Sequence, residues 1–510
     1  MLSCSLVPPV AEPPKHPAAA PGRGVFSPAA TIPSNRKTVN LETVNDNASW
    51  TRRSLAHVWH PCTQMQDHEW LPLVPIRSAQ GVWLEDFEGR RYIDAVSSWW
   101  TSIFGHRHPH VVARLKEQLD RLDHVLLAGF THEPVVRLSE KLCAVAPPGL
   151  SRCFYADNGS SAVEVALKMS AHYWRNCGQP GKTRYIALSN GYHGETLGAL
   201  AVSGAGMYRD AYAPLLMEPV YVRSPDCFER TPGESWEDHT RRRFRDMEEA
   251  LQKHAGTVAA VILEPLVQCA GGMRMYHPIY LRLLREACTR HGVHLIADEI
   301  AVGFGRTGRL FAWEWAFGTA ANDPMSFAAG QTQPASPDFL CLSKGLTAGT
   351  LPLSVVMTTD TVYQAFYADY AAGKAFLHSH SFTGNALACA AALAALELFE
   401  QSDVLAANRR LAQLMWAAMA GLSSHRNVID LRQQGMILAV ELAKNPRKRE
   451  PYPAAERRGL RVYRHGLEKG VLLRPLGNVV YLMPPYVITP EEIVTMCQAA
   501  IEGIELATRD

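Results

Sequence analysis

Two charged residues stand where buried strands of an α/β domain would end. In HLIADEI, Asp298 follows four mostly apolar residues, and in DFLCLSKG, Lys344 follows another apolar run and precedes a glycine. A desolvated lysine can act as an amine nucleophile and proton carrier, and a carboxylate so placed can keep a ring nitrogen protonated. Taken singly, Asp298 also fits a strand-end cap and Lys344 a solvated surface lysine. The pair indicates amine chemistry at an electron-accepting ring.

A second pair of segments offers groups for a phosphate and for an aromatic ring. In DNGSSAVEVALK, Gly159 and Ser160 lie at a strand-to-helix junction, where free N–H groups and the helix dipole favour an anion. In SNGYHGET, Tyr192 lies on a glycine-flanked turn, where its ring can stack on another ring. An ordinary helix N-cap and an exposed turn tyrosine are the alternatives.

Composition narrows the class of protein. A chain of 510 residues, 47% hydrophobic and with a net charge of +2, predicts more than one domain and a small-molecule partner, with no nucleic acid partner. Eleven cysteines without a CxxC pair favour free thiols in a reducing cytoplasm. No apolar run is long enough to cross a membrane. His106, His108 and His110 lack a carboxylate or cysteine companion in sequence, so no metal site is predicted.

The chain divides into four parts. Residues 1–45 are rich in proline and alanine without an apolar face, so we expect a disordered tail; a transit peptide is the less favoured alternative. Residues 98–400 alternate strand-like and helical runs, which predicts a large α/β domain with a mostly parallel sheet. Within it, 319–337 reads as an inserted exposed loop. Residues 46–97 and 401–510 are expected to form a smaller α+β domain together.

Six segments resemble, in this order, the class III aminotransferases of fold type I: DNGSSAVEVALK, NGYHGET, EPLVQCAGG, ADEIAVGFGRTG, LSKGLTAG and SFTGNALACAAA. The resemblance covers about residues 57–500. It implies the fold of the PLP-dependent transferases of type I, pyridoxal 5′-phosphate (PLP) as cofactor, and a homodimer whose two active sites are each completed by the partner subunit.

The resemblance also implies cofactor contacts. Lys344 matches the lysine that holds PLP as a Schiff base and moves the proton, and Asp298 matches the partner of the pyridine nitrogen. Gly159 and Ser160 match the phosphate site, and Tyr192 matches the residue that stacks on the ring.

Further segments, HPCTQM, SSWW, GGMRMYHP and LRPLGNVVYLMPPY, resemble the branch of the family that makes 7,8-diaminononanoate for biotin. Its substrates are S-adenosylmethionine as amino donor and 8-amino-7-oxononanoate as acceptor. Trp99, Trp100 and Tyr192 then line the substrate channel, and Arg474 grips the substrate carboxylate, a task that suits a planar guanidinium. Arg306 can either touch substrate or brace its own loop.

Two sites depart from that branch. Cys62 stands at the substrate position where the family usually has a tyrosine, and His378-Ser379-His380-Ser381 replaces His-Gly-Pro-Thr. We still expect Ser381, with His380, to contact the cofactor phosphate from the second subunit, and Ser379 to contact substrate. These departures keep lysine as donor, or another ω-aminotransferase reaction, as alternatives. A non-catalytic scaffold of the same fold is the remote alternative.

Overall fold

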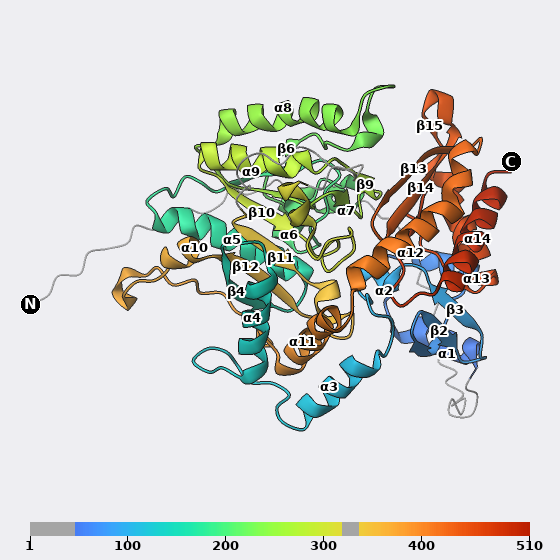
Figure 1. Ribbon diagram of the computed structural model, residues 1–510, viewed down its shortest axis with the longest axis horizontal. Coiled ribbons are helices and arrows are strands. Elements are labelled where there is room, and N and C mark those ends of the chain that lie inside the picture. The colour runs from blue at the N-terminus through green and yellow to red at the C-terminus, as the bar shows by residue number, and fades with distance from the viewer. Residues whose placement is uncertain (1–45, 319–335, 510) are drawn as a thin grey trace, which may run out of the picture.

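The computed structural model describes residues 46–318 and 336–509, apart from the side chain of Met207. Figure 1 shows a large α/β body on the left and a smaller body on the right, where the C-terminus lies. The expected tail, 1–45, and all of the expected loop 319–337 except its last two residues lie outside the described residues. The domain boundaries given above stay predictions.

The large body is built on a seven-stranded mixed sheet in the order β4-β12-β11-β10-β7-β5-β6. Only β12 is antiparallel to its neighbours, so the expected mostly parallel sheet is confirmed. Its strands are β4 (Leu150–Ala156), β5 (Arg184–Leu188), β6 (Val220–Val222), β7 (Val258–Leu263), β10 (His294–Asp298), β11 (Phe339–Leu342) and β12 (Ser354–Thr359).

Helices cover both faces of this sheet. Successive residues of β10 point to opposite faces, and Leu295 and Ala297 belong to one apolar cluster while Ile296 belongs to another. Helix α5 (Gly159–Asn176) packs in the second cluster and α9 (Ile279–His291) in the first, so they lie on opposite faces. This explains why β10 is buried along its whole length rather than on alternate residues.

The remaining helices and short strands of the large body lie around this core: α3 (Pro109–Leu119), α4 (Glu133–Val145), α6 (Leu197–Ala201), α7 (Gly206–Arg209), α8 (Trp236–His254), α10 (Asp360–Gln364), α11 (Ala386–Gln401), β8 (Val267–Gln268) and β9 (Arg274–Met275). No helix in the described part of the chain is both long and apolar enough to cross a membrane.

The smaller body joins segments from both ends of the chain. The N-terminal segment supplies α1 (Asn47–His57), β1 (Ile76–Gln80), β2 (Trp83–Asp86) and β3 (Arg91–Asp94), followed by α2 (Ser97–Trp100). The C-terminal segment supplies α12 (Val404–Met419), β13 (Val428–Gln434), β14 (Ile437–Asn445), β15 (Glu450–Pro451), α13 (Arg458–Glu468), β16 (Val471–Leu472), β17 (Val479–Leu482) and α14 (Pro490–Ala507). β16 pairs in parallel with β3, which ties the two ends together.

Candidate active site

A cavity of about 200 Å³ lies at the carboxyl end of the central sheet. Its lining includes six residues that the sequence singled out: Trp100, Gly159, Ser160, Tyr192, Asp298 and Lys344. Asp298 ends β10, and Lys344 follows β11, the neighbouring parallel strand. Because parallel strands end at the same edge, the two side chains meet there although they are far apart in sequence.

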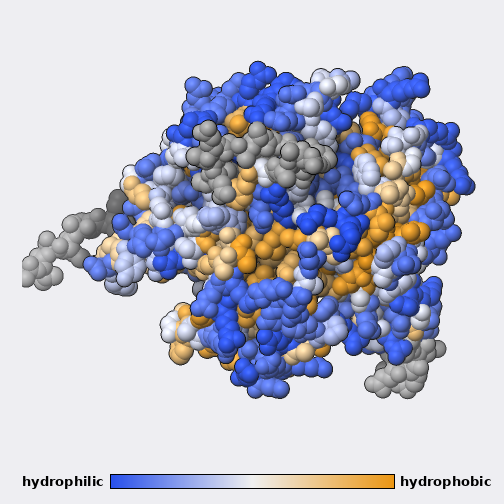
Figure 2. Space-filling model, in the orientation of Figure 1, coloured by the Kyte–Doolittle hydropathy of each residue, from blue (hydrophilic) through white to orange (hydrophobic). Residues whose placement is uncertain are grey.

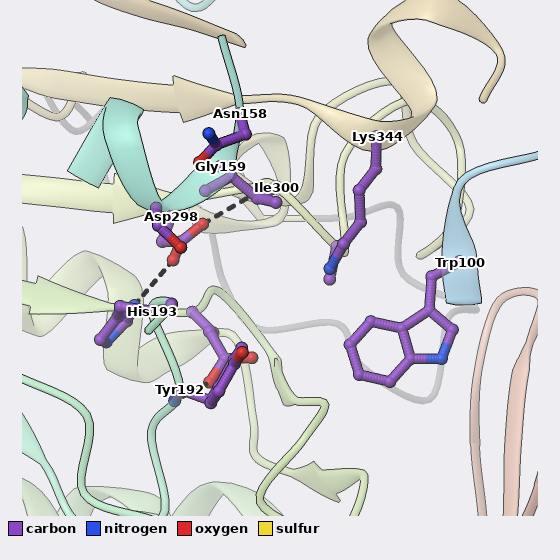
Figure 3. Close-up of a pocket in the computed structure, with 12 residues that line it drawn as sticks. Trp100, Asn158, Gly159, Tyr192, His193, Asp298, Ile300 and Lys344 are labelled. Atoms are coloured by element: carbon purple, nitrogen blue, oxygen red, sulfur yellow. Dashed lines mark hydrogen bonds and ion pairs between the residues drawn. The ribbon is translucent and has the colours of Figure 1, made fainter. Parts of the chain in front are cut away.

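Asp298 is held in a fixed orientation by two donors. Its Oδ2 lies 2.7 Å from His193 Nδ1, and its Oδ1 accepts a hydrogen bond of 3.1 Å from the backbone N–H of Ile300, as the dashed lines in Figure 3 show. Asp298 is only 3% exposed. A carboxylate that is buried and oriented in this way can pair with a cationic ring nitrogen.

Lys344 is partly buried and reaches across the cavity towards Trp100 (Figure 3). Its Nζ lies 4.5 Å from the centroid of the Trp100 ring. Burial lowers the pKa of the Lys344 ammonium below its ordinary value, while nearby acidic groups, Asp298 among them, oppose that shift. A lowered pKa makes the neutral, nucleophilic amine more accessible.

Glu264 fixes the loop that carries Tyr192. Its carboxylate accepts hydrogen bonds from the backbone N–H groups of Tyr192, at 3.0 Å, and Cys269, at 2.9 Å. Burial raises the pKa of the Glu264 carboxyl to about 7, helped by the charge of Asp298 and opposed by His193. Glu264 lines the cavity, and each of its oxygens accepts from a backbone N–H, which fixes this loop in place.

An anion cradle lies at the N-terminus of α5. Asn158 caps the helix, accepting from Ser161 N with its side chain and from Ala162 N with its carbonyl. Because the first N–H groups of a helix have no partner within it, those of Gly159 and Ser160 are left for a ligand. The Ser160 hydroxyl accepts from Glu195 N at 3.1 Å, which links the cradle to the Tyr192 loop.

Gly194 leaves no room for a side chain beside this cradle. A Cβ on Gly194 would lie 2.1 Å from Ser160 Oγ, and its φ of +124° disfavours other residues. We predict that Gly194→Ala weakens PLP binding by roughly tenfold or more, since overpacking costs about 1–3 kcal/mol. The dissociation constant can be measured from the cofactor absorbance. Gly178→Ala, at φ +79° with open space around it, is the control; equal loss in both variants would contradict the prediction.

The two tryptophans sit on an unusual turn. Ser97, Ser98, Trp99 and Trp100 have φ values of 49°, 45°, 69° and 74°, so α2 is one turn of left-handed helix. For residues with a Cβ this conformation costs about 1–2 kcal/mol each. It places Trp100 beside Lys344, and Trp99 beside Arg474, whose guanidinium carbon lies 4.6 Å from the Trp99 ring.

Cys62 belongs to the same surroundings as Arg474. Burial raises the pKa of the Cys62 thiol, the charge of Glu195 adds to that effect and the charge of Arg474 opposes it. Glu195 accepts a hydrogen bond of 2.9 Å from the Tyr192 hydroxyl, whose pKa is raised by burial and by Glu195. Of the predicted substrate residues, Cys62 and Arg474 therefore lie near Glu195 and the Tyr192 hydroxyl.

The segment around His380 does not line the cavity within this chain. His380 Nδ1 lies 3.3 Å from Asp157 Oδ2, next to the cradle, while the Ser381 carbonyl accepts from His124 Nε2 at 2.8 Å. Ser379 is exposed. Contacts of Ser379, His380 and Ser381 with a cofactor or substrate of a second subunit stay a prediction.

Arg306 braces its loop. Its guanidinium is buried and donates to the carbonyl of Pro484 at 2.7 Å, and it is not part of the cavity lining. His106, from the histidine-rich segment, is likewise engaged elsewhere: its Nε2 lies 2.9 Å from Asp94 Oδ2.

Sequence reasoning missed His193, although it directly follows Tyr192 in NGYHGET. Its partner, Asp298, is 105 residues away, so the contact becomes visible only once β10 and that loop are side by side. Glu195 was missed for a similar reason, since nothing in the sequence places it beside Cys62 and Arg474.

These features fit PLP. The cavity offers an oriented carboxylate at Asp298, a partly buried amine at Lys344, and a helix N-terminus with free N–H groups at Gly159 and Ser160, where a Gly194 Cβ would intrude. A ring nitrogen, a carbonyl carbon and a phosphate are the groups that this donor set can hold.

Comparison with known proteins agrees with this chemistry. The family model described as aminotransferase class III matches residues 64–504. Proteins named adenosylmethionine-8-amino-7-oxononanoate aminotransferase are 43% identical in Helicobacter pylori, over 88% of this chain and 96% of that protein, and 41% identical in Geobacter sulfurreducens, over 90% and 97%.

Solved structures agree as well. The enzyme of the same name from Methanocaldococcus jannaschii matches with a TM-score of 0.82 and 35% identity, over 90% of this chain and 99% of that one. The omega transaminase from Pseudomonas jessenii in complex with PMP matches with a TM-score of 0.82 and 26% identity, over 90% and 98%. The chain therefore belongs to the class III aminotransferases, a family that depends on pyridoxal phosphate.

Proposed function

We propose that this aminotransferase moves the amino group of S-adenosylmethionine to 8-amino-7-oxononanoate and so makes 7,8-diaminononanoate for biotin synthesis. The observation that carries the proposal is Arg474 beside Trp99, which directly precedes the cavity residue Trp100: a guanidinium there can bind a substrate carboxylate. Relatives that bear this function in their names, at 41–43% identity over most of their length, support the choice of substrates.

Different residues of the chain bind the cofactor and transfer the proton. When bound, PLP supplies an electron sink that acidifies the carbon bearing the amino group. Asp298, fixed by His193, keeps the ring nitrogen protonated, and Gly159 and Ser160 hold the phosphate through N–H groups at the start of α5. Lys344 is the residue that attaches the cofactor, and its Nζ takes up the proton from the substrate carbon and returns it in each half-reaction.

The donor can be identified in the first half-reaction alone. Enzyme loaded with PLP is mixed with S-adenosylmethionine or with lysine, without acceptor, and the visible spectrum of the bound cofactor is followed. We expect S-adenosylmethionine to change the spectrum at least tenfold faster than lysine, a difference of about 1.4 kcal/mol in the barrier. The reverse order would make lysine the donor, the alternative that Ser379 and His380 keep open.

Arg474→Ala tests the carboxylate site. Within the described residues Arg474 forms no ion pair, so its guanidinium is available to a substrate. Loss of a charge-assisted bidentate contact costs roughly 1.5–3 kcal/mol, so kcat/KM for 8-amino-7-oxononanoate should fall by about ten- to a hundredfold. A simple aldehyde or amine without a carboxylate should react about as well as with wild type.

Two further variants make this test sharper. Arg474→Lys keeps the charge and loses the planar fork, so an intermediate loss is expected. Arg464→Ala, an exposed arginine on α13, controls for loss of surface charge. Equal losses for substrates with and without a carboxylate would remove the binding role from Arg474.

The proposal includes a homodimer in the cytoplasm. Exposed apolar side chains gather where the segment before α4 meets the segment before α11: Leu126, Phe130, Leu377 and Phe382. The His124 and Phe382 rings lie 5.0 Å apart, so the two segments adjoin. Figure 2 shows a further band of hydrophobic residues across the middle of one face. Sedimentation of the full chain at several concentrations tests for the dimer.

A further inference from the structure

The left-handed turn Ser97–Trp100 needs an anchor, because four successive residues with a Cβ do not adopt this conformation by preference. Strained backbone of this kind persists only where the surrounding structure determines it, and it gathers at functional sites. The turn carries both tryptophans of the cavity, Trp100 beside Lys344 and Trp99 beside Arg474.

Asp94 makes the contacts that fix the start of this turn. It is fully buried at the end of β3, and its Oδ1 accepts from Ser98 N at 2.9 Å while its Oδ2 accepts from Ser98 Oγ at 2.7 Å. His106 Nε2 lies 2.9 Å from the same Oδ2 and holds the carboxylate from its other side. In the left-handed turn, Ser98 N and the Ser98 hydroxyl both face the Asp94 carboxylate.

Two longer-range contacts hold the rest of the turn. The Ser97 hydroxyl donates to the Met483 carbonyl at 2.7 Å, and Trp100 Nε1 donates to the Tyr481 hydroxyl at 3.1 Å. Both acceptors lie on or just after β17, in the C-terminal segment. These contacts hold the turn against the small body, while Asp94 holds Ser98.

We propose that Asp94 is a positioning residue: through Ser98 it holds the Ser97–Trp100 turn in its left-handed form and so fixes Trp100 beside Lys344 and Trp99 beside Arg474. Asp94 itself does not line the cavity. Its effect on substrate binding rests on the proposed function, but its effect on the two tryptophans does not.

The test uses the full chain loaded with PLP and labelled with 5-fluorotryptophan, in which ¹⁹F NMR reports on each of the 11 tryptophans. Trp99→Phe and Trp100→Phe assign the two signals. In Asp94→Ala we expect these two to shift or broaden while the others stay in place, with kcat/KM reduced about ten- to a hundredfold. Asp94→Asn retains an acceptor for Ser98 N, so its signal shifts and its kcat/KM should lie between those of wild type and Asp94→Ala.

Two variants of Ser98, whose side chain is exposed, test the backbone strain separately from the hydroxyl contact. Ser98→Ala and Ser98→Gly both lose the hydroxyl, but glycine adopts a φ near +45° freely. We expect the two signals to move in Ser98→Ala and to stay near wild type in Ser98→Gly, and we expect Ser98→Gly to restore part of the loss in an Asp94→Ala background. Ser423→Ala, an exposed serine on η7 (Ala420–Ser424), is the control.

The Ser98 comparison decides the matter even if Asp94→Ala does not fold. Unchanged Trp99 and Trp100 signals in Ser98→Ala, or identical spectra for Ser98→Ala and Ser98→Gly, would overturn the proposal. The ¹⁹F result is independent of the amino donor, so a failure of the proposed function would leave it standing.

Discussion

Replacing Lys344 by alanine should abolish covalent attachment of the cofactor and reduce turnover by roughly 10²–10⁴-fold or more, because both the attaching amine and the proton carrier are lost. The described lining of the cavity contains no second lysine that could replace it. PLP should still bind through the cradle at Gly159 and Ser160 and through Asp298. Borohydride reduction followed by mass spectrometry of the denatured chain measures the attachment, and a steady-state assay measures the rate.

Lys448→Ala is the matched control, since that lysine is exposed on η8 (Pro446–Lys448), in the smaller body. It should keep both the attached cofactor and the rate of wild type. A Lys344→Ala protein that is still modified after reduction, at a position other than 344, would show that another amine holds PLP.

Asp298→Asn should reduce turnover by roughly 10²–10³-fold while leaving the fold intact, the scale expected when one fixed electrostatic partner of a transition state is lost. Asparagine has nearly the same shape: its single oxygen can still accept from Ile300 N, and its amide N–H can donate to His193 Nδ1 when that nitrogen is unprotonated. What it lacks is the negative charge that pairs with the ring nitrogen. Turnover measures the loss of rate, the visible spectrum of the bound cofactor measures the change at the ring nitrogen, and the melting temperature shows whether the fold is intact.

His193→Gln tests the contact that orients Asp298 separately from the Asp298 charge. Loss of the 2.7 Å contact should free the Asp298 carboxylate without removing its charge, so a smaller decrease is expected than for Asp298→Asn. A near-normal rate in Asp298→Asn would mean that another group protonates the ring.

Much of the structure of the large body could be predicted from local sequence patterns. The apolar run before Asp298 and the one before Lys344 both formed buried strands, and the Gly159–Ser160 junction formed the capped start of α5. Strand periodicity and capping are short-range properties, so they can be read from a single sequence.

Contacts between distant segments could not be read in this way. The Ser97 hydroxyl bonds to Met483, 386 residues later, and nothing local predicts a left-handed conformation for Ser97 or Trp100. Arg306 remained undecided until its Nη1 was seen to donate to the Pro484 carbonyl. Such features depend on how the two bodies pack, which is decided by the sum of many tertiary contacts rather than by a motif.

The most direct test of the proposed reaction follows the nitrogen atom itself. S-adenosylmethionine labelled with ¹⁵N at its α-amino group is incubated with the PLP-loaded enzyme and 8-amino-7-oxononanoate, and the product is examined by mass spectrometry. We expect 7,8-diaminononanoate that carries the label at its new amino group, and no product in Lys344→Ala. Absence of labelled 7,8-diaminononanoate, or its formation only from labelled lysine, would contradict the proposed reaction.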